Sequence, residues 1–138
     1  MNCVKSCGFI AYKEIDNIYF YLIIKATNDD VGFPKGHMEK SETEIETAIR
    51  ELKEETNIEV LLIDGFRYQI EYPLPKNKNT IKQSVYFLGK CVNDEIICQE
   101  KEVSEAKFTT FEEALEILTF EETKKMLQLA NEYLNSIK

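Results

Sequence analysis

Residues 36–58 read GHMEKSETEIETAIRELKEETNI, and this stretch carries most of what the sequence says about fold and site. A glycine loop leads into a helical pattern that contains Glu51, Glu54 and Glu55. These carboxylates are spaced i, i+3 and i+4, so they line one ridge of the helix. Like charges at this spacing repel each other, and hard divalent cations take oxygen ligands of this kind. The stretch therefore predicts a metal site that handles phosphates.

The helix is expected to begin at Ser41, because Ser41 and Glu44 have the S-x-x-E spacing of a capping box. Apolar residues recur at i, i+3, i+4 and i+7 and predict one buried face: Ile45, Ala48, Ile49 and Leu52. Glu51 and Glu55 are expected to flank that face, partly shielded from solvent. Asn57 follows the last turn, where asparagine is the next-best residue after glycine for a left-handed cap.

Turn residues divide the rest of the chain into strand and helix patterns. A hairpin is expected over 3–13 and 18–27, then a loop over 28–41 and strands at 58–72, 80–92, 95–98 and 105–109. Capping boxes at Thr110 and Thr119 predict two further helices. The second helix is expected to place Phe120, Leu127, Ala130, Leu134 and Ile137 on or near one face. Strands interleaved with three helices imply an α+β fold, a mixed β-sheet with helices packed on it.

Length and charge limit the classes of function. A chain of 138 residues has the size of one domain with one core. The net charge of −8 argues against long nucleic acid as a partner, because that partner needs a basic face. A small polyphosphate that arrives with its own cations is compatible with this charge. The sequence has no run of about 18 apolar residues and no signal-like start, so we expect no membrane contact and a cytoplasmic location.

The four cysteines, Cys3, Cys7, Cys91 and Cys98, form no C-x-x-C pair, and the single histidine lies far from them in sequence. Free thiols packed as small hydrophobic groups are therefore expected, rather than a zinc site. A redox-active pair stays open at this level.

The spacing of residues 36–58 closely resembles the Nudix box, G-x5-E-x7-R-E-U-x-E-E-x-G-U, where U is a bulky apolar residue. Eight positions fall in register: Gly36, Glu42, Arg50, Glu51, Leu52, Glu54, Glu55 and Ile58. Asn57 replaces the second glycine of the box, and asparagine adopts the left-handed backbone that this position needs.

This resemblance implies a single Nudix hydrolase domain over 1–138, folded as an α/β/α sandwich with a mixed β-sheet. It implies attack of water on phosphorus in a nucleoside diphosphate linked to another group, with Mg²⁺ or Mn²⁺ as cofactor. By resemblance the cations are held by Glu51, Glu54, Glu55 and the carbonyl of Gly36. Arg50 is then structural and pairs with a carboxylate. Glu42 is that partner, or it only favours the helix N-terminus.

A wider likeness points to the asymmetric diadenosine tetraphosphate hydrolases. It rests on GFPKGH at 32–37, Cys7-Gly8 and Gly65-Phe66-Arg67, and it runs from about Ser6 to Glu113. It implies cleavage of diadenosine tetraphosphate to ATP and AMP. Other Nudix substrates stay open: a MutT-like nucleoside triphosphate, an RNA 5′ end or a diphosphoinositol phosphate. A domain that binds nucleotides without cleaving them is a further alternative.

The same likeness suggests the substrate-binding residues. Tyr72 is expected to stack on a base, with Tyr86 as a second stacking candidate. Phosphate contacts are expected from Lys35, His37 and Lys78. Several of these side chains have a plainer interpretation. Tyr86 lies in a strand and is equally compatible with a core position, and His37 is compatible with a solvated loop. Lys76, Lys78 and Lys82 are compatible with a solvated connection.

One glutamate outside the box completes the expected site. In the family, a glutamate in the loop before the last helices faces the metals as ligand or general base. Counted back from Phe108, Glu102 is the best match and Glu105 is the reserve. Glu51, Glu54 and Glu102 are the expected catalytic residues.

Overall fold

A computed structural model describes residues 2–74 and 77–138, except for the side chains of Asn2, Leu74, Asn77 and Lys78. The chain begins with the predicted hairpin, in which β1 (Asn2–Ile15) pairs antiparallel with β2 (Ile18–Ala26). Its two-residue turn places Asp16 at φ 53° and Asn17 at φ 67°. Aspartate and asparagine tolerate this left-handed region, which is why the turn forms here.

One mixed sheet runs through the molecule. The remaining strands are β3 (Val31–Gly32), β4 (Lys35–His37), β5 (Val60–Leu74), β6 (Asn77–Cys91) and β7 (Val103–Thr110). The central order is β3-β2-β1-β6-β5, with β4 paired to β1 and β7 to β2. The β1–β6 pair is parallel and the other pairs are antiparallel. The two short strands lie inside the segment predicted as a loop.

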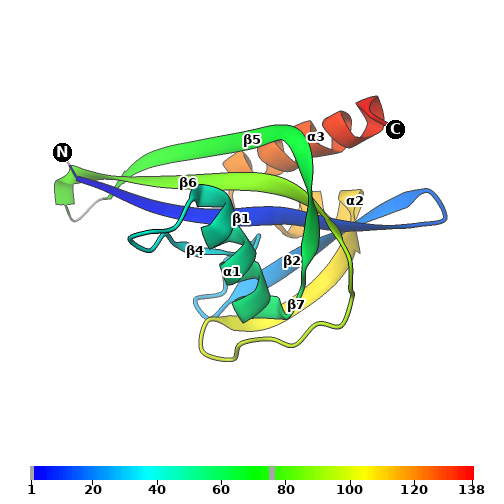
Figure 1. Ribbon diagram of the computed structural model, residues 1–138, viewed down its shortest axis with the longest axis horizontal. Coiled ribbons are helices and arrows are strands. Elements are labelled where there is room, and N and C mark those ends of the chain that lie inside the picture. Colours follow the sequence, from blue (N-terminus) through cyan, green and yellow to red (C-terminus); the bar gives the residue numbers. More distant parts are fainter. Residues whose placement is uncertain (1, 75–76) are drawn as a thin grey trace.

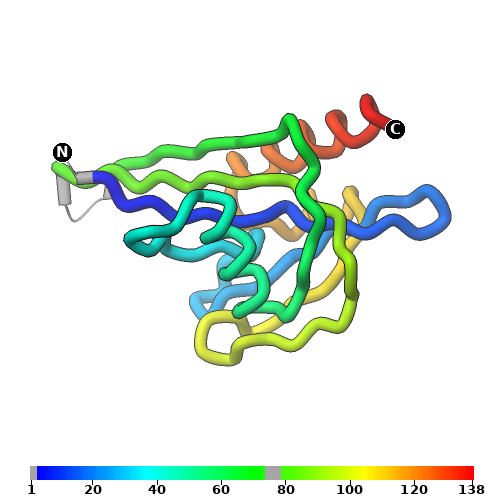
Figure 2. The backbone as a smooth tube through the Cα atoms, in the orientation of Figure 1, coloured from blue at the N-terminus to red at the C-terminus, as the bar shows by residue number. Residues whose placement is uncertain are grey.

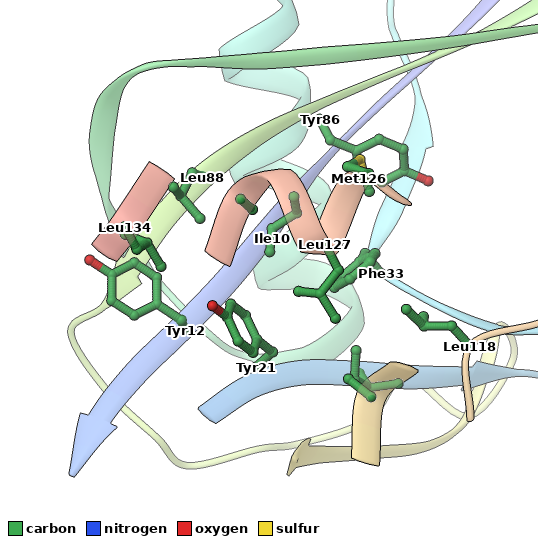
Figure 3. Packing of buried hydrophobic residues seen from close by; sticks show 13 residues of the cluster. Ile10, Tyr12, Tyr21, Phe33, Tyr86, Leu88, Leu118, Met126, Leu127 and Leu134 are labelled. Atoms are coloured by element: carbon green, nitrogen blue, oxygen red, sulfur yellow. The ribbon is translucent and has the colours of Figure 1, made fainter. Parts of the chain in front are cut away.

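Helices cover both faces of this sheet, as Figure 1 shows: α1 (Glu44–Thr56) crosses in front of the strands, and α2 (Phe111–Ile117) and α3 (Glu121–Ser136) lie behind them. One buried cluster joins α1 to the sheet through Ala48 and Leu52. A larger cluster joins α2 and α3 to the other face through residues such as Met126 and Leu127 (Figure 3). The predicted α+β fold, an α/β/α sandwich with a mixed sheet, is confirmed.

A sharp bend divides β5, as the green part of the tube in Figure 2 shows. Gly65 has φ +96° there, and the register with β6 shifts between Ile63 and Arg67. The hydroxyl of Tyr133 in α3 donates to the carbonyl of Asp64 at 2.6 Å. A side chain at residue 65 would collide with that hydroxyl. Glycine is therefore required both for the positive φ and for the space.

The predicted start of α1 at Ser41 is wrong. Thr43 is the N-cap, and the capping box is Thr43 with Glu46, whose backbone N–H donates to the Thr43 hydroxyl at 3.1 Å. Both pairs have the same spacing, so sequence alone does not separate them. Residues 39–42 instead form a turn, because the carboxylate of Glu42 is drawn toward Arg50 at 2.6 Å.

The predicted buried face of α1 is also partly wrong. Ile49 is 48% exposed, whereas Glu51 and Glu55 are buried. The segment between β6 and β7 covers the C-terminal end of the helix: the amide of Ile97 donates to the carbonyl of Thr56 at 3.0 Å. The covering segment therefore buries the side of the helix that carries Glu51 and Glu55. Residues 95–98, which were predicted as a strand, belong to this segment.

The predicted cap at Thr119 is wrong for a similar reason. The hydroxyl of Thr119 accepts the backbone N–H of Val31 at 2.7 Å, and Phe120 is the N-cap of α3 without a side-chain cap bond. Phe120 and Ile137 are 54% and 51% exposed, so neither joins the buried face predicted for this helix. The cap predicted at Thr110 is present, since its hydroxyl accepts the N–H of Glu113 at 3.2 Å.

All four cysteines are free thiols. Cys7 is buried, and burial raises its pKa to about 11, which makes it a poor nucleophile. Within residues 2–74 and 77–138, we find no helix that is both long and apolar enough to cross a membrane.

Candidate functional site

Three carboxylates from two distant parts of the chain meet beside α1. Oxygen atoms of Glu51, Glu55 and Glu102 all lie within 4.8 Å of one another. Glu51 and Glu55 are buried, and Glu102 is exposed. Three carboxylate oxygens this close together repel one another strongly unless a cation lies between them. The donor set consists only of oxygen, which suits Mg²⁺ or Mn²⁺.

The loop before β7 brings Glu102 to this cluster. Its backbone is fastened to the end of α1, where the amide of Gln99 donates to the carbonyl of Glu55 at 3.0 Å. Asn57, with φ 69°, caps the helix and donates from its side chain to the carbonyl of Glu95 at 3.0 Å. The predicted left-handed cap at Asn57 is confirmed, and the same residue thus anchors the loop that carries Glu102. Glu105 lies in β7 opposite Lys25 and is outside the three-carboxylate cluster.

Arg50 organises the outer side of the glutamate ridge. Its guanidinium donates to both oxygens of Glu42, at 2.6 and 3.0 Å, and to Glu51 at 3.0 Å and Glu54 at 3.2 Å. Of the two roles open for Glu42, the structure shows that of Arg50's partner. This bidentate pairing holds the pKa of Glu42 down at about 2. Arg50 also donates to the carbonyl of His37 at 3.0 Å, which ties the helix to β4.

Glu55 is left without such a partner. Its Oε2 is buried and makes no hydrogen bond to any residue that the structure describes. Burial raises the pKa of Glu55, and the neighbouring carboxylates of Glu51 and Glu102 raise it further. A buried carboxylate oxygen without a hydrogen-bond partner, beside two other carboxylates, suits coordination to a cation, so the residues present fit a divalent metal.

Gly36 lies where β4 passes over the ridge. A Cβ at this position would overlap the Glu51 carboxylate, so only glycine lets the backbone approach this closely. The approach agrees with the expectation that the Gly36 carbonyl adds a metal ligand, which stays a prediction. Glu54 lies on the same ridge as expected, but its side chain is 50% exposed and it is outside the three-carboxylate cluster.

Two hollows open beside the carboxylates. The smaller has a volume of about 340 Å³ and is lined by Ser6, Lys35, Gly36, His37, Glu39, Glu51 and Glu102. The larger has a volume of about 630 Å³, and Lys35 and Glu102 line it too. The shared residues join the carboxylate cluster to a cavity whose size suits a nucleotide-sized ligand.

The end of the larger cavity near the carboxylates carries two ammonium groups. Lys35 and Lys82 both line it, and burial together with the positive charge of Lys82 lowers the pKa of Lys35. Two facing cations of this kind suit a phosphate chain. His37 is exposed and lines the smaller hollow only. The Lys78 side chain lies outside the described residues, as does Lys76, so their expected roles stay predictions.

The lining of the larger cavity also includes aromatic rings. Tyr72, 40% exposed, and Phe120, 54% exposed, both line it. The ammonium of Lys82 lies 5.9 Å from the centre of the Tyr72 ring, which places the two predicted kinds of contact side by side. Exposed rings at a cavity are suited to stacking on a base.

Tyr86 combines the two interpretations that the sequence leaves open. It is only 3% exposed and belongs to the larger buried cluster, where its ring meets that of Phe33 at 6.2 Å. It also lines the cavity, and Figure 3 shows its hydroxyl pointing outward from the cluster. Burial raises the pKa of Tyr86, so the hydroxyl is a hydrogen-bond donor at neutral pH. A polar contact suits this residue better than stacking.

The hollows are also lined by residues that the sequence does not single out as site residues, among them Ser6, Ser84, Phe120 and Glu122. Ser6 and Ser84 face each other in the parallel β1–β6 pair, and that register is not visible in the sequence. Phe120 precedes a helix and resembles a core residue in the periodic pattern, so no local signal separates the two roles.

Comparisons with known proteins agree with this geometry. The NUDIX domain family model matches residues 17–130. The bis(5′-nucleosyl)-tetraphosphatase [asymmetrical] of Mus musculus is 31% identical, over 96% of this chain and 97% of the mouse protein. The Rattus norvegicus protein of the same name is 28% identical over the same shares. Among solved structures, the binary complex of a Caenorhabditis elegans Ap4A hydrolase superposes with a TM-score of 0.87 at 26% identity, covering 96% of this chain and 98% of that one.

Proposed function

Because the chain belongs to the NUDIX family and is a pyrophosphohydrolase, we propose that it cleaves dinucleoside tetraphosphates asymmetrically, releasing ATP and AMP from diadenosine tetraphosphate. One observation carries the proposal. The carboxylate cluster opens into a cavity that is lined by two ammonium groups and by exposed aromatic rings. A phosphate chain that ends in a nucleoside matches this set of groups. The names of the mouse, rat and nematode relatives support the same substrate class.

The proposed cofactor is Mg²⁺ or Mn²⁺, held by Glu51, Glu55 and Glu102, with Glu54 and the Gly36 carbonyl as further ligands. A bound dication lowers the pKa of a coordinated water and offsets negative charge on the phosphoryl oxygens. The orphaned Oε2 of Glu55 supports this assignment, because a cation gives that buried oxygen its missing partner.

The side chains divide the remaining work. Lys35 and Lys82 bind the phosphate chain, and Tyr72 with Phe120 holds the base in the same cavity. The exposed carboxylate of Glu102, which lines both hollows, takes the proton of the attacking water. As the water oxygen bonds to phosphorus, one bridging P–O bond breaks and the nucleotide beyond it leaves.

The sparse positive charge of the cavity weighs against the inositol alternative. Among the described residues that line it, the cations are Lys35 and Lys82, whereas a diphosphoinositol phosphate carries many more negative charges. Nucleoside triphosphates and RNA 5′ ends remain to be compared directly. We also propose that residues 1–138 form one domain, since both buried clusters share one sheet. The cytoplasmic location stays a sequence-based prediction.

Product analysis tests the proposal. Purified protein is incubated with diadenosine tetraphosphate and Mg²⁺ or Mn²⁺, and the products are separated by anion-exchange chromatography. Equal amounts of ATP and AMP are expected, and a chelator should stop their release. Two molecules of ADP, or no turnover with either cation, would refute the asymmetric reaction. A panel with nucleoside triphosphates and a triphosphorylated RNA, ranked by kcat/KM, identifies the preferred substrate.

A further inference from the structure

One buried hydroxyl in the larger cavity has no role in the site described so far. Ser84 is 2% exposed and lines the cavity, and its Oγ has no hydrogen-bond partner among the residues that the structure describes. Buried polar groups are nearly always hydrogen-bonded, because an unsatisfied one destabilises the fold. A hydroxyl in this condition at a cavity wall points to a ligand that completes it.

The register of β5 and β6 locates this hydroxyl. Tyr72 lies opposite Lys82, Ile70 opposite Ser84, and Tyr68 opposite Tyr86. Side chains two residues apart share a face of the sheet, so Ser84 lies between Lys82 and Tyr86 on the cavity face. Its cross-strand neighbour, Ile70, is apolar. The hydroxyl therefore lies two residues along β6 from Lys82, which is paired with the stacking candidate Tyr72, in the direction of Tyr68 and Tyr86.

One carboxylate faces the same region. Glu122, in the first turn of α3, lines the cavity and accepts the hydroxyl of Tyr68 at 3.3 Å, which leaves its second oxygen available. Three other carboxylates of the lining are engaged or remote. Glu71 alternates along β5 with Ile70 and Tyr72 and is bonded on one oxygen by Gln69 and Gln83, which share its side of the ribbon. Asp30 is bonded on one oxygen by Asn28 of its own loop, and the Glu121 side chain is 89% exposed.

We propose that Ser84 and Glu122 read the hydrogen-bonding edge of guanine, so that the site prefers guanine-containing dinucleoside polyphosphates. Guanine presents an acceptor, O6, beside two donors, N1–H and the N2 amino group. A hydroxyl donates to O6, and the available carboxylate oxygen accepts the neighbouring N1–H in a charge-assisted hydrogen bond. Adenine presents a donor and then the N1 lone pair, which a carboxylate repels. The inference rests on the proposed function and specifies the base that its substrate carries.

Two measurements test this preference. The first measures kcat/KM for diguanosine tetraphosphate and for diadenosine tetraphosphate. It is carried out on the wild-type protein, on Ser84→Ala and Glu122→Gln, and on a control, Glu132→Gln, which changes an exposed glutamate of α3 away from the cavity. The wild type should favour guanine by about tenfold, the size of one or two hydrogen bonds. Ser84→Ala and Glu122→Gln should remove most of that ratio by lowering the guanine value, whereas Glu132→Gln should keep it.

The second measurement is calorimetric titration with GMP and AMP in the presence of Mg²⁺, which needs no turnover. Tighter binding of GMP supports the inference even if neither dinucleotide is cleaved, and in that case the proposed function fails alone. Equal cleavage of both dinucleotides together with equal binding of GMP and AMP would overturn the inference and leave the proposed function standing. The wild-type ratios need no variant, so misfolding of Ser84→Ala would not remove the test.

Discussion

Replacing Glu55 by glutamine is expected to stabilise the metal-free protein and to abolish its response to Mg²⁺. Glu55 is 3% exposed, and its Oε2 has no partner within the described chain. Burial, with the nearby charges of Glu51 and Glu102, raises the pKa of Glu55 from 4.5 to about 9. Glutamine has nearly the same shape and no charge, so it removes this unfavourable burial.

The magnitude follows from the difference between the pKa values in the folded and unfolded chain. At pH 7 the unfolded chain has Glu55 ionised, whereas the folded chain must keep it protonated. A gap of about 2.5 pH units corresponds to about 3 kcal/mol at about 1.4 kcal/mol per unit. After the cost of burying the glutamine amide, the net gain is about 2 kcal/mol, or roughly 7 °C in melting temperature.

The sign of the pH dependence is fixed by the raised pKa. Below pH 4.5 Glu55 is protonated in both states, so its ionisation contributes nothing and only the cost of burying the glutamine amide separates the variant from the wild type. As the pH rises toward 9, the metal-free wild type loses stability from this group and the variant does not, so the gap widens.

Urea unfolding in a chelator at pH 4, 6 and 8, repeated with saturating Mg²⁺, measures both effects. Mg²⁺ should raise the unfolding free energy of the wild type by mass action and that of Glu55→Gln far less. Glu132→Gln is the matched control. A metal-free Glu55→Gln variant that is less stable than the wild type at pH 8 would refute the reasoning.

Three further predictions use other parts of the site. Glu54→Gln should lower turnover of diadenosine tetraphosphate by orders of magnitude while leaving the unfolding midpoint unchanged, because this side chain is half exposed; near wild-type kcat would contradict its metal role. Gly36→Ala should weaken Mn²⁺ binding roughly 10–100-fold in calorimetric titration, since the new Cβ displaces the Glu51 carboxylate. Glu44, whose pKa the Arg67 guanidinium lowers to about 2, should contribute about 1–2 kcal/mol above pH 4.5 that is lost as the pH falls toward 2. Thermal unfolding of Glu44→Gln from pH 7 to pH 3 checks this, and a constant difference across that range would contradict it.

The features that depend on local spacing were predictable from the sequence. The glutamate ridge of α1 needs only the helical repeat, and the hairpin turn at Asp16 and Asn17 needs only residues that tolerate positive φ. The cap at Asn57 follows in the same way. Local spacing does not decide where α1 begins, because Ser41 with Glu44 and Thr43 with Glu46 both have the spacing of a capping box. The contact between Glu42 and Arg50 selects the second pair.

The features that depend on contacts between distant segments were not predictable. Glu102 reaches the cluster because its loop is fastened to the end of α1; the family resemblance favours it over Glu105, but its local sequence alone does not distinguish the two. Phe120 has the spacing of a core residue, yet it lines a cavity because the helix begins one residue after it. The position of Ser84 at the cavity follows only from the pairing of β6 with β1 and β5, which the sequence does not reveal.

The charge arrangement explains why such an acidic helix is tolerated. Arg50 lies on the outer side of the ridge, where its single guanidinium contacts Glu42, Glu51 and Glu54 and screens their mutual repulsion. On the inner side Lys35 offsets only part of the repulsion, and no described residue gives the buried Oε2 of Glu55 a hydrogen bond beside Glu51 and Glu102. An arginine there would stabilise the metal-free fold and occupy the position of a dication at the same time. The fold therefore retains an unfavourably buried carboxyl group at a place where binding of a metal relieves the cost, so stability and metal affinity are set by the same side chain.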